Sequence, residues 1–332
     1  MEPSQVHALI SQISDQHILK RSPTSHIDAF VSAVCRTYPG QNLGDILQNK
    51  FFIPNESNYT DDGFFESASE LSVANHIKLK SISNFETEKN VNPTNNSDVD
   101  VYFELNAIKV SLEVKCPVEV DQSKLGDVVL KTAGRLPNFR STLQELQQTL
   151  EGGNSRPKVI KGKNKDMTHK DFLLSAQSKF NPESNVDQHQ LNILFIACGY
   201  YFNINEWYLH LYGSEGLFTD SPFHSPSEFR NVDLVILSNL KYCHQHAREF
   251  HDWTLREVFL LPFINPHGRP SFNPDAVRTG LSVFDHHLDE FESFLGDGSP
   301  DFIFAAQKVN HYVSGHLDSA RKDRYFPIKL TT

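Results

Sequence analysis

The chain has 332 residues, and its composition, 39% hydrophobic with 16 glycines and 17 prolines, is that of a globular protein and excludes a disordered or fibrous one. No apolar run approaches the roughly 18 residues of a membrane span, and four scattered cysteines exclude a disulfide scaffold and a cysteine-rich zinc site. Taken alone, the formal charge of −10 argues against a nucleic-acid partner, because an acidic surface repels phosphate.

The N-terminal part of the chain has a helical pattern. Its first residues lack the basic start and apolar block of a secretory signal, so we expect a cytoplasmic protein. Apolar residues at helical spacing predict two helices within residues 1–50, the second ending at Pro39-Gly40. Residues 64–79 predict another helix that is apolar on more than one face and carries Glu66 and Glu70 four residues apart.

After a polar loop at residues 90–97, the pattern changes from helical to alternating. Residues 98–105 and 108–115 each alternate with a period of two, and Asn106-Ala107 separates them. This arrangement predicts two strands joined by a tight turn. The hairpin is the clearest local structure in the sequence.

The hairpin register places charged residues opposite each other. A turn centred between residues 106 and 107 pairs residues whose numbers sum to 213, which puts Asp100 opposite Glu113 and Asp98 opposite Lys115. Glu113 and Lys115 leave the same face of their strand. Two carboxylates and an ammonium are therefore expected to share one patch.

The remainder of the chain predicts an α/β arrangement. Residues 117–168 are polar, broken by glycine and proline, and are best described as an insertion. The expected elements that follow are a helix at 171–180, a strand buried on both faces at 191–198, strands at 232–237 and 258–264, and helices at 281–295 and 301–322. We divide the chain into an N-terminal helical region (1–60), a core (61–240) and a C-terminal strand and helices packed on the core (241–332).

The clustered charges of the hairpin suggest a metal-dependent reaction. Two carboxylates about 5 Å apart repel each other unless a cation lies between them. Mg²⁺ prefers oxygen ligands and usually takes one or two carboxylates, completing its shell with water and substrate phosphate. Lys115 is then placed to orient or deprotonate the attacking water. These groups suit hydrolysis of a phosphodiester bond.

Asp100 and Glu113-Val114-Lys115, with an acidic helix upstream and a helix and a strand downstream, resemble the core of the PD-(D/E)XK nuclease superfamily over residues 64–200. The resemblance implies an α/β fold with a restriction-endonuclease-like mixed central sheet flanked by helices, here with N- and C-terminal helical additions. It implies Asp100, Glu113 and the backbone carbonyl of Val114 as metal ligands, and Lys115 as the catalytic lysine. The cofactor would be Mg²⁺, for which Mn²⁺ can substitute.

The resemblance also extends to the flanking helices. Some of these nucleases place a glutamate on the first helix, where Glu70 fits and Glu66 is the alternate. Others carry a polar residue on the helix after the lysine strand, which Gln177 matches. The proline that often precedes the family's aspartate is missing here, so Asp98 remains the alternate to Asp100, which the register favours.

The negative net charge hides a basic segment. Residues 156–170 carry a charge of +5, which leaves −15 for the rest of the chain. Such a segment could close over a phosphate backbone. The lysines expected to contact nucleic acid are Lys158, Lys161, Lys163, Lys165, Lys170 and Lys179.

The sequence thus predicts a Mg²⁺-dependent nuclease. We expect a DNA endonuclease in restriction or phage defence, a context that the resemblance alone implies. DNA is favoured over RNA, and cutting both strands would need a homodimer. The alternative is a nuclease-like module that binds nucleic acid or assembles with partners and cleaves nothing.

Overall fold

The computed structural model describes residues 2–118, 165–181, 189–199, 201–246, 252–256, 260–269 and 274–284, with isolated short pieces between 128 and 160 and at 258. The helices are α1 (Pro3–Ser11), α2 (Thr24–Thr37), α3 (Leu43–Phe51), α4 (Asp61–Lys78), α6 (Lys165–Lys179), α7 (Tyr201–Tyr212), α8 (Leu240–Gln245) and α9 (Pro274–Leu281), with 3-10 turns η1 (Ile18–Arg21), η4 (Pro226–Glu228) and η5 (Ser282–Phe284). The strands are β1 (Ser83–Lys89), β2 (Val99–Leu105), β3 (Ile108–Lys115), β4 (Val128–Val129), β5 (Val159–Ile160), β6 (Gln190–Ala197), β7 (Leu234–Ser238) and β8 (Leu260–Ile264).

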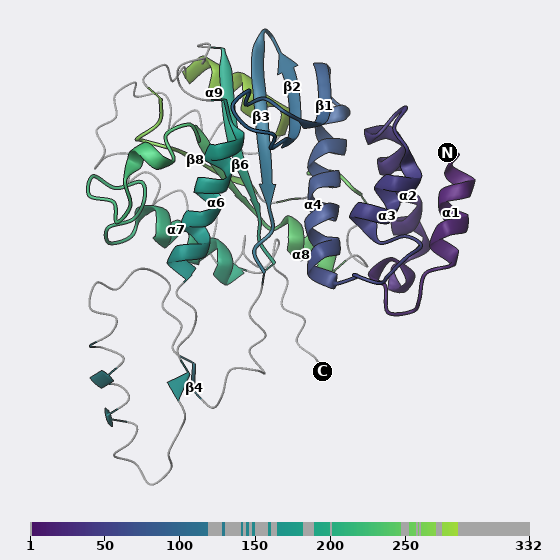
Figure 1. Ribbon diagram of the computed structural model, residues 1–332, viewed down its shortest axis with the longest axis horizontal. Helices are drawn as coiled ribbons and strands as arrows, with labels where there is room; N and C mark the ends of the chain where they lie inside the picture. Colours follow the sequence, from purple (N-terminus) through teal and green to yellow (C-terminus); the bar gives the residue numbers. More distant parts are fainter. Residues whose placement is uncertain are drawn as a thin grey trace.

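A six-stranded mixed sheet of order β1-β2-β3-β6-β7-β8 forms the centre of the molecule (Figure 1). β1, β2 and β3 are antiparallel, β3, β6 and β7 are parallel, and β8 is antiparallel to β7. Every residue of β6 is buried, as its continuous apolar pattern predicts for a central parallel strand. The α/β class with helices on both faces of a mixed sheet is confirmed.

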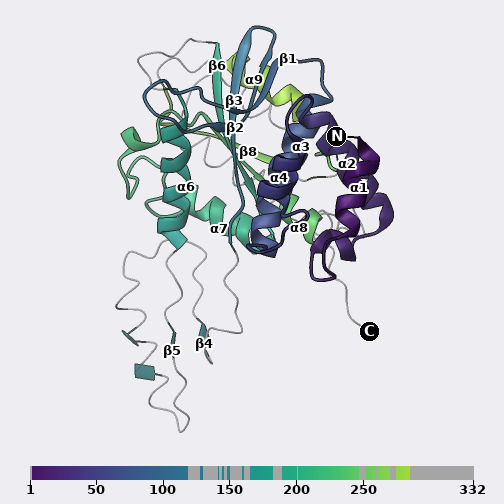
Figure 2. The same ribbon diagram turned by 45° about the vertical axis from the view of Figure 1, so that its right-hand side comes forward.

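The two faces of the sheet belong to separate hydrophobic clusters. Leu112 and Val114 of β3 point to the face covered by α4, α8 and α9. Leu194 and Ile196 of β6 point to the other face, which α6 and α7 cover. Figure 2 shows α4 and α6 on opposite sides of the sheet. Because side chains alternate along a strand, Glu113 shares the α6 face.

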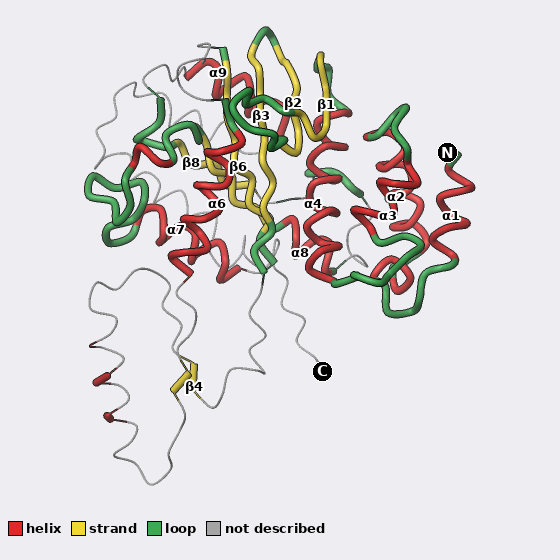
Figure 3. The backbone as a smooth tube through the Cα atoms, viewed as in Figure 1, coloured by secondary structure: helices red, strands yellow, loops and turns green. Residues whose placement is uncertain are grey.

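Outside the sheet, α2 and α3 pack on α4, and α1 packs on α2 (Figure 3). α4 is buried on several sides, since Phe64, Leu71 and Ile77 lie within the core that α2 and α3 also enter. A helix that is apolar on more than one face fits a position between two layers. One continuous core joins α1 to η5, so the N-terminal helices are integral to this face of the molecule.

Several elements differ from the expectation. β1, α3, α7 and α8 were not predicted: β1 is polar and half exposed, and α3 and α8 are too short to show a clear period. The predicted helix at 281–295 is wrong at its start, because α9 ends at Leu281 and η5 follows. Most of 117–168, and everything after residue 284, lies outside the described residues. No described helix is long and apolar enough to cross a membrane.

Candidate active site

The predicted hairpin register is confirmed. β2 and β3 pair Val101 with Leu112, and the same register places Asp100 opposite Glu113. The backbone pairing between β2 and β3 ends at Val101. Beyond it, the side chain of Asp100 joins the two strands: its Oδ2 accepts a 2.6 Å hydrogen bond from the backbone N–H of Val114. The carboxylate of Asp100 is thereby held against the carboxyl end of β3.

Glu113 is the most enclosed member of the site, with 0% of its side chain exposed. Its Oε1 lies 2.7 Å from the Nζ atoms of both Lys115 and Lys179. Lys179 also donates a 2.9 Å hydrogen bond to Oε2. A buried carboxylate without a cation would cost several kcal/mol, and the two ammonium groups offset this cost at Glu113.

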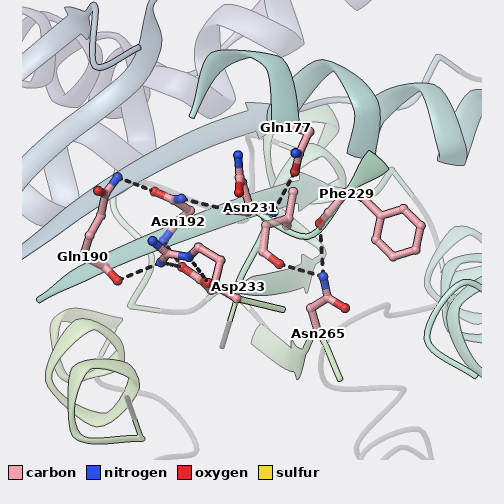
Figure 4. A network of polar contacts seen from close by, with 9 residues as sticks. Gln177, Gln190, Asn192, Phe229, Asn231, Asp233 and Asn265 are labelled. Carbon is pink, nitrogen blue, oxygen red and sulfur yellow. Dashed lines mark hydrogen bonds and ion pairs between the residues drawn. The ribbon is translucent and has the colours of Figure 1, made fainter. Parts of the chain in front are cut away.

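Gln177 lies on α6, the helix that follows the lysine strand, and its side chain contacts the backbone before β7. Its Oε1 accepts a 2.7 Å hydrogen bond from the backbone N–H of Asn231, just before β7 (Figure 4). Asn231 is itself held by Asn192, whose amide donates to its carbonyl at 2.8 Å. Gln177 therefore anchors α6 to a buried polar network, while Lys179, on the same helix, reaches Glu113.

The end of α6 is held from the other side by the loop between β1 and β2. The side chains of Asn92 and Asn95 both donate to the carbonyl of Ser178, Asn92 at 2.8 Å. Carbonyls in the last turn of a helix lack intrahelical partners, so these amides cap α6. The cap and Gln177 together fix the turn from which Lys179 extends.

Helix α4 contributes Glu70, and α3 contributes a cation that the sequence did not point to. Lys50 Nζ lies 2.8 Å from Glu70 Oε2 and 2.7 Å from Glu88 Oε1. Glu88 is on β1, in the register position opposite Asp100, between the pairs Thr87–Val101 and Lys89–Val99. The N-terminal helical region thus supplies a charged group to the site.

The carboxylates of the site outnumber its cations. Burial and the charge of Glu113 raise the pKa of Asp100 to about 7, although Lys179 and the hydrogen bond from Val114 oppose the shift. Burial and the charge of Asp100 raise the pKa of Glu70, against Lys50. Partial burial and the charge of Glu70 also raise the pKa of Glu66. The site would accept further positive charge.

Lys115 is held in its protonated form. Burial lowers its pKa, but the charge of Glu113 and their hydrogen bond raise it more, so that the net pKa lies above the usual value. A lysine in this state can orient a water molecule or neutralise developing negative charge. It is poorly suited to remove a proton near neutral pH.

The oxygen atoms at the carboxyl end of β3 are of the kind that Mg²⁺ prefers as ligands. Asp100 and Glu113 offer hard oxygen ligands. The carbonyl of Val114 would offer another, because the N–H and C=O of one strand residue leave the same side of the strand and this N–H donates to Asp100. In the described part of the chain, no three His, Cys, Asp or Glu side chains form a group that could hold a metal ion. The expected set of two carboxylates and a carbonyl does not require a third such side chain.

The remaining predicted residues have varied outcomes. Asp98 is exposed and precedes β2, outside the paired residues of the hairpin, and Lys115 contacts Glu113. Glu66 lies one turn before Glu70 on α4 and is more exposed than Glu70. Lys170 lies 3.8 Å from Asp171. Lys158, Lys161 and Lys163 lie outside the described residues, and only the backbone of Lys165 is described.

Comparison of the chain with protein-family models, with curated proteins and with solved structures finds no match.

Proposed function

We propose that this protein is a Mg²⁺-dependent nuclease with a restriction-endonuclease-like core. The observation that carries the proposal is the convergence of Asp100, Glu113 and Lys115 at the carboxyl end of β3, where burial and the charge of Glu113 raise the pKa of Asp100. The chain order of α4, the β2–β3 hairpin, α6 and β6 supports it, because this is the order the PD-(D/E)XK resemblance implies.

The proposed mechanism assigns a task to each group. Asp100, Glu113 and the Val114 carbonyl would hold Mg²⁺, which when bound polarises a phosphoryl oxygen and makes water more acidic. Lys115, protonated beside Glu113, would orient the attacking water and neutralise charge on the phosphate. Glu70 and Lys179 flank these groups, Lys179 at 2.7 Å from Glu113.

The substrate is proposed to be DNA, cut internally, in restriction or phage defence. The basic segment at 156–170 supports a phosphate partner, because its +5 charge contrasts with the acidic remainder. Lys179 is assigned here to the catalytic cluster, since it contacts a buried carboxylate. A homodimer and a cytoplasmic location remain predictions.

Plasmid cleavage tests the proposal. The wild-type chain with Mg²⁺ should nick or linearise supercoiled plasmid, whereas Lys115→Ala and Asp100→Asn should each lower the rate by about 100-fold or more. Asp98→Asn, two residues from the site and exposed, is the matched control and should retain cleavage. Full activity of either site variant would contradict the assignment.

One observation favours the second candidate, a nuclease-like module that binds nucleic acid or a partner without cleaving. Glu113 and Glu70 are already paired with lysines, so these two buried charges are partly balanced by the chain itself. Melting curves with and without millimolar Mg²⁺ or Mn²⁺ separate the candidates, because a cation that binds the folded state raises the midpoint. An unchanged midpoint would favour the inert module.

A further inference from the structure

Lys50 lies on the opposite side of Asp100 from Glu113. Asp100 is on β2, between β3, which carries Glu113, and β1, which carries Glu88. The Lys50 ammonium bridges Glu88 at 2.7 Å and Glu70 at 2.8 Å. It approaches from α3, so a separate layer of the fold delivers this charge into the site.

The two sides of Asp100 differ in how their carboxylates are balanced. On the β1 side, one ammonium joins two different carboxylates, as a metal ion between them would. On the β3 side, Lys115 and Lys179 both contact Glu113, and the second carboxylate, Asp100, accepts a backbone N–H. Two facing carboxylates repel each other unless they share a cation. Among the described ion pairs, Glu70 and Glu88 share Lys50, whereas no lysine pairs with both Glu113 and Asp100.

The inference rests on the proposed function and specifies its metal content. We propose that Lys50 is a built-in cation that takes the place of a second metal ion, so that the site loads one divalent cation, at Asp100 and Glu113. Lys50 is then a positioning residue that acts through Glu70. The role also explains why its side chain is only 21% exposed between two carboxylates.

Removing the ammonium should open a second metal position. In Lys50→Met, Glu70 and Glu88 would be left without the cation that joins them, and two carboxylates are enough for Mg²⁺ or Mn²⁺, which completes its shell with water. Lys50→Arg would keep the positive charge. The double variant Lys50→Met/Glu70→Gln would remove the ammonium together with one of its carboxylates.

The experiment is a titration of the full chain with Mn²⁺, with bound ion counted by calorimetry or by the electron-spin resonance signal of free Mn²⁺. We expect one ion per chain for the wild type, for Lys50→Arg and for the double variant, and two for Lys50→Met. Lys89→Met is the matched control and should bind one ion, because Lys89 pairs with Glu86 at 2.7 Å on the same strand as Glu88.

The outcomes separate the two proposals. Two ions in the wild type, or one in a folded Lys50→Met, would overturn the role of Lys50 and leave the proposed metal site intact. No Mn²⁺ bound by the wild type would contradict the proposed function itself and this inference with it. If Lys50→Met does not fold, Lys50→Gln carries the same test, since it also removes the positive charge: two ions support the role of Lys50 and one ion overturns it.

Discussion

At the scale of single residues, the two facing carboxylates of the site differ in how well the fold stabilises their charge. Glu113 is buried beside two lysines, whereas Asp100 has one backbone hydrogen bond and a raised pKa. Active sites often combine groups that are unfavourable in the free protein, because the same groups bind ligand. At Asp100, the cost of such a group can be measured as a change in the free energy of unfolding.

Asp100→Asn should stabilise the metal-free protein at pH 8. A carboxyl whose folded pKa is raised contributes stability at low pH and loses it as the pH rises through the folded value, here about 7. Asparagine cannot ionise, and it can still accept the hydrogen bond from Val114. We expect a gain on the order of 2 kcal/mol at pH 8, which shrinks as the pH falls toward 4.

Chemical denaturation at several pH values, without metal, measures this effect. Asp98→Asn is the control, because Asp98 is exposed and such a change usually alters stability by less than about 0.5 kcal/mol. Adding Mg²⁺ should stabilise the wild type and not Asp100→Asn. A variant less stable than the wild type at pH 8 would show that Asp100 is not under electrostatic strain.

At the scale of elements, the β2–β3 hairpin determines the geometry of the site. Its two-residue turn has positive φ at both positions, 49° at Asn106 and 66° at Ala107. Such turns match the right-handed twist of the strands and so fix a register in which Asp100 faces Glu113. Alanine is unusual at the second position, because a Cβ is unfavourable in this conformation.

Ala107→Gly should therefore stabilise the fold. Glycine adopts positive φ without steric cost, and we expect a gain of about 0.5–1 kcal/mol in the free energy of unfolding. Ala8→Gly, at an exposed position within α1, is the same chemical change in a helix and should lower stability by about 1 kcal/mol. Urea denaturation of both variants makes the comparison, and a loss of stability in Ala107→Gly would contradict the turn assignment.

At the scale of the whole molecule, buried histidines join segments that are far apart in the sequence. His244 of α8 contacts Ser72 Oγ of α4 at 3.0 Å, and His17 contacts the carbonyl of Phe51 at 3.0 Å. Burial lowers the pKa of His244 to about 3 and also lowers that of His17. Burial therefore favours the neutral imidazole, because a charged ring in either place would cost several kcal/mol.

The protein should consequently lose stability in mild acid. A histidine with a lowered folded pKa contributes its full stability above the unfolded value of 6.5, and the contribution falls with pH until the folded value is reached. The slope is about 1.4 kcal/mol per pH unit for each such histidine. Melting curves between pH 7 and pH 4.5 measure it.

A variant that cannot titrate isolates the contribution of His244. His244→Gln should show a flatter pH dependence than the wild type, whatever its stability at pH 7. His7→Gln is the control and should keep the wild-type slope, because the His7 side chain is partly exposed. Its Nε2 lies 3.3 Å from Asp28 Oδ1. An identical slope in His244→Gln would exclude this residue as the cause.

Local patterns were sufficient to predict the centre of the fold and half of the site. The hairpin and the buried strand β6 follow from alternation and from a continuous apolar run, which neighbouring residues alone determine. Asp100, Glu113 and Lys115 could be placed together because a short turn fixes the register between them. β1 was missed because its polar, half-exposed residues do not show which neighbour it pairs with.

Only the tertiary structure placed the remaining charges. Lys179 lies 66 residues from Glu113 in sequence, and Lys50 lies 20 residues from Glu70, so no spacing rule connects either pair. The packing of α6 and α3 decides which ammonium reaches which carboxylate, and it turns Gln177 toward Asn231. The sequence by itself therefore determined a facing acid pair and its lysine. The fold decided how these charges are balanced, because balance depends on side chains from separate elements meeting in a buried space.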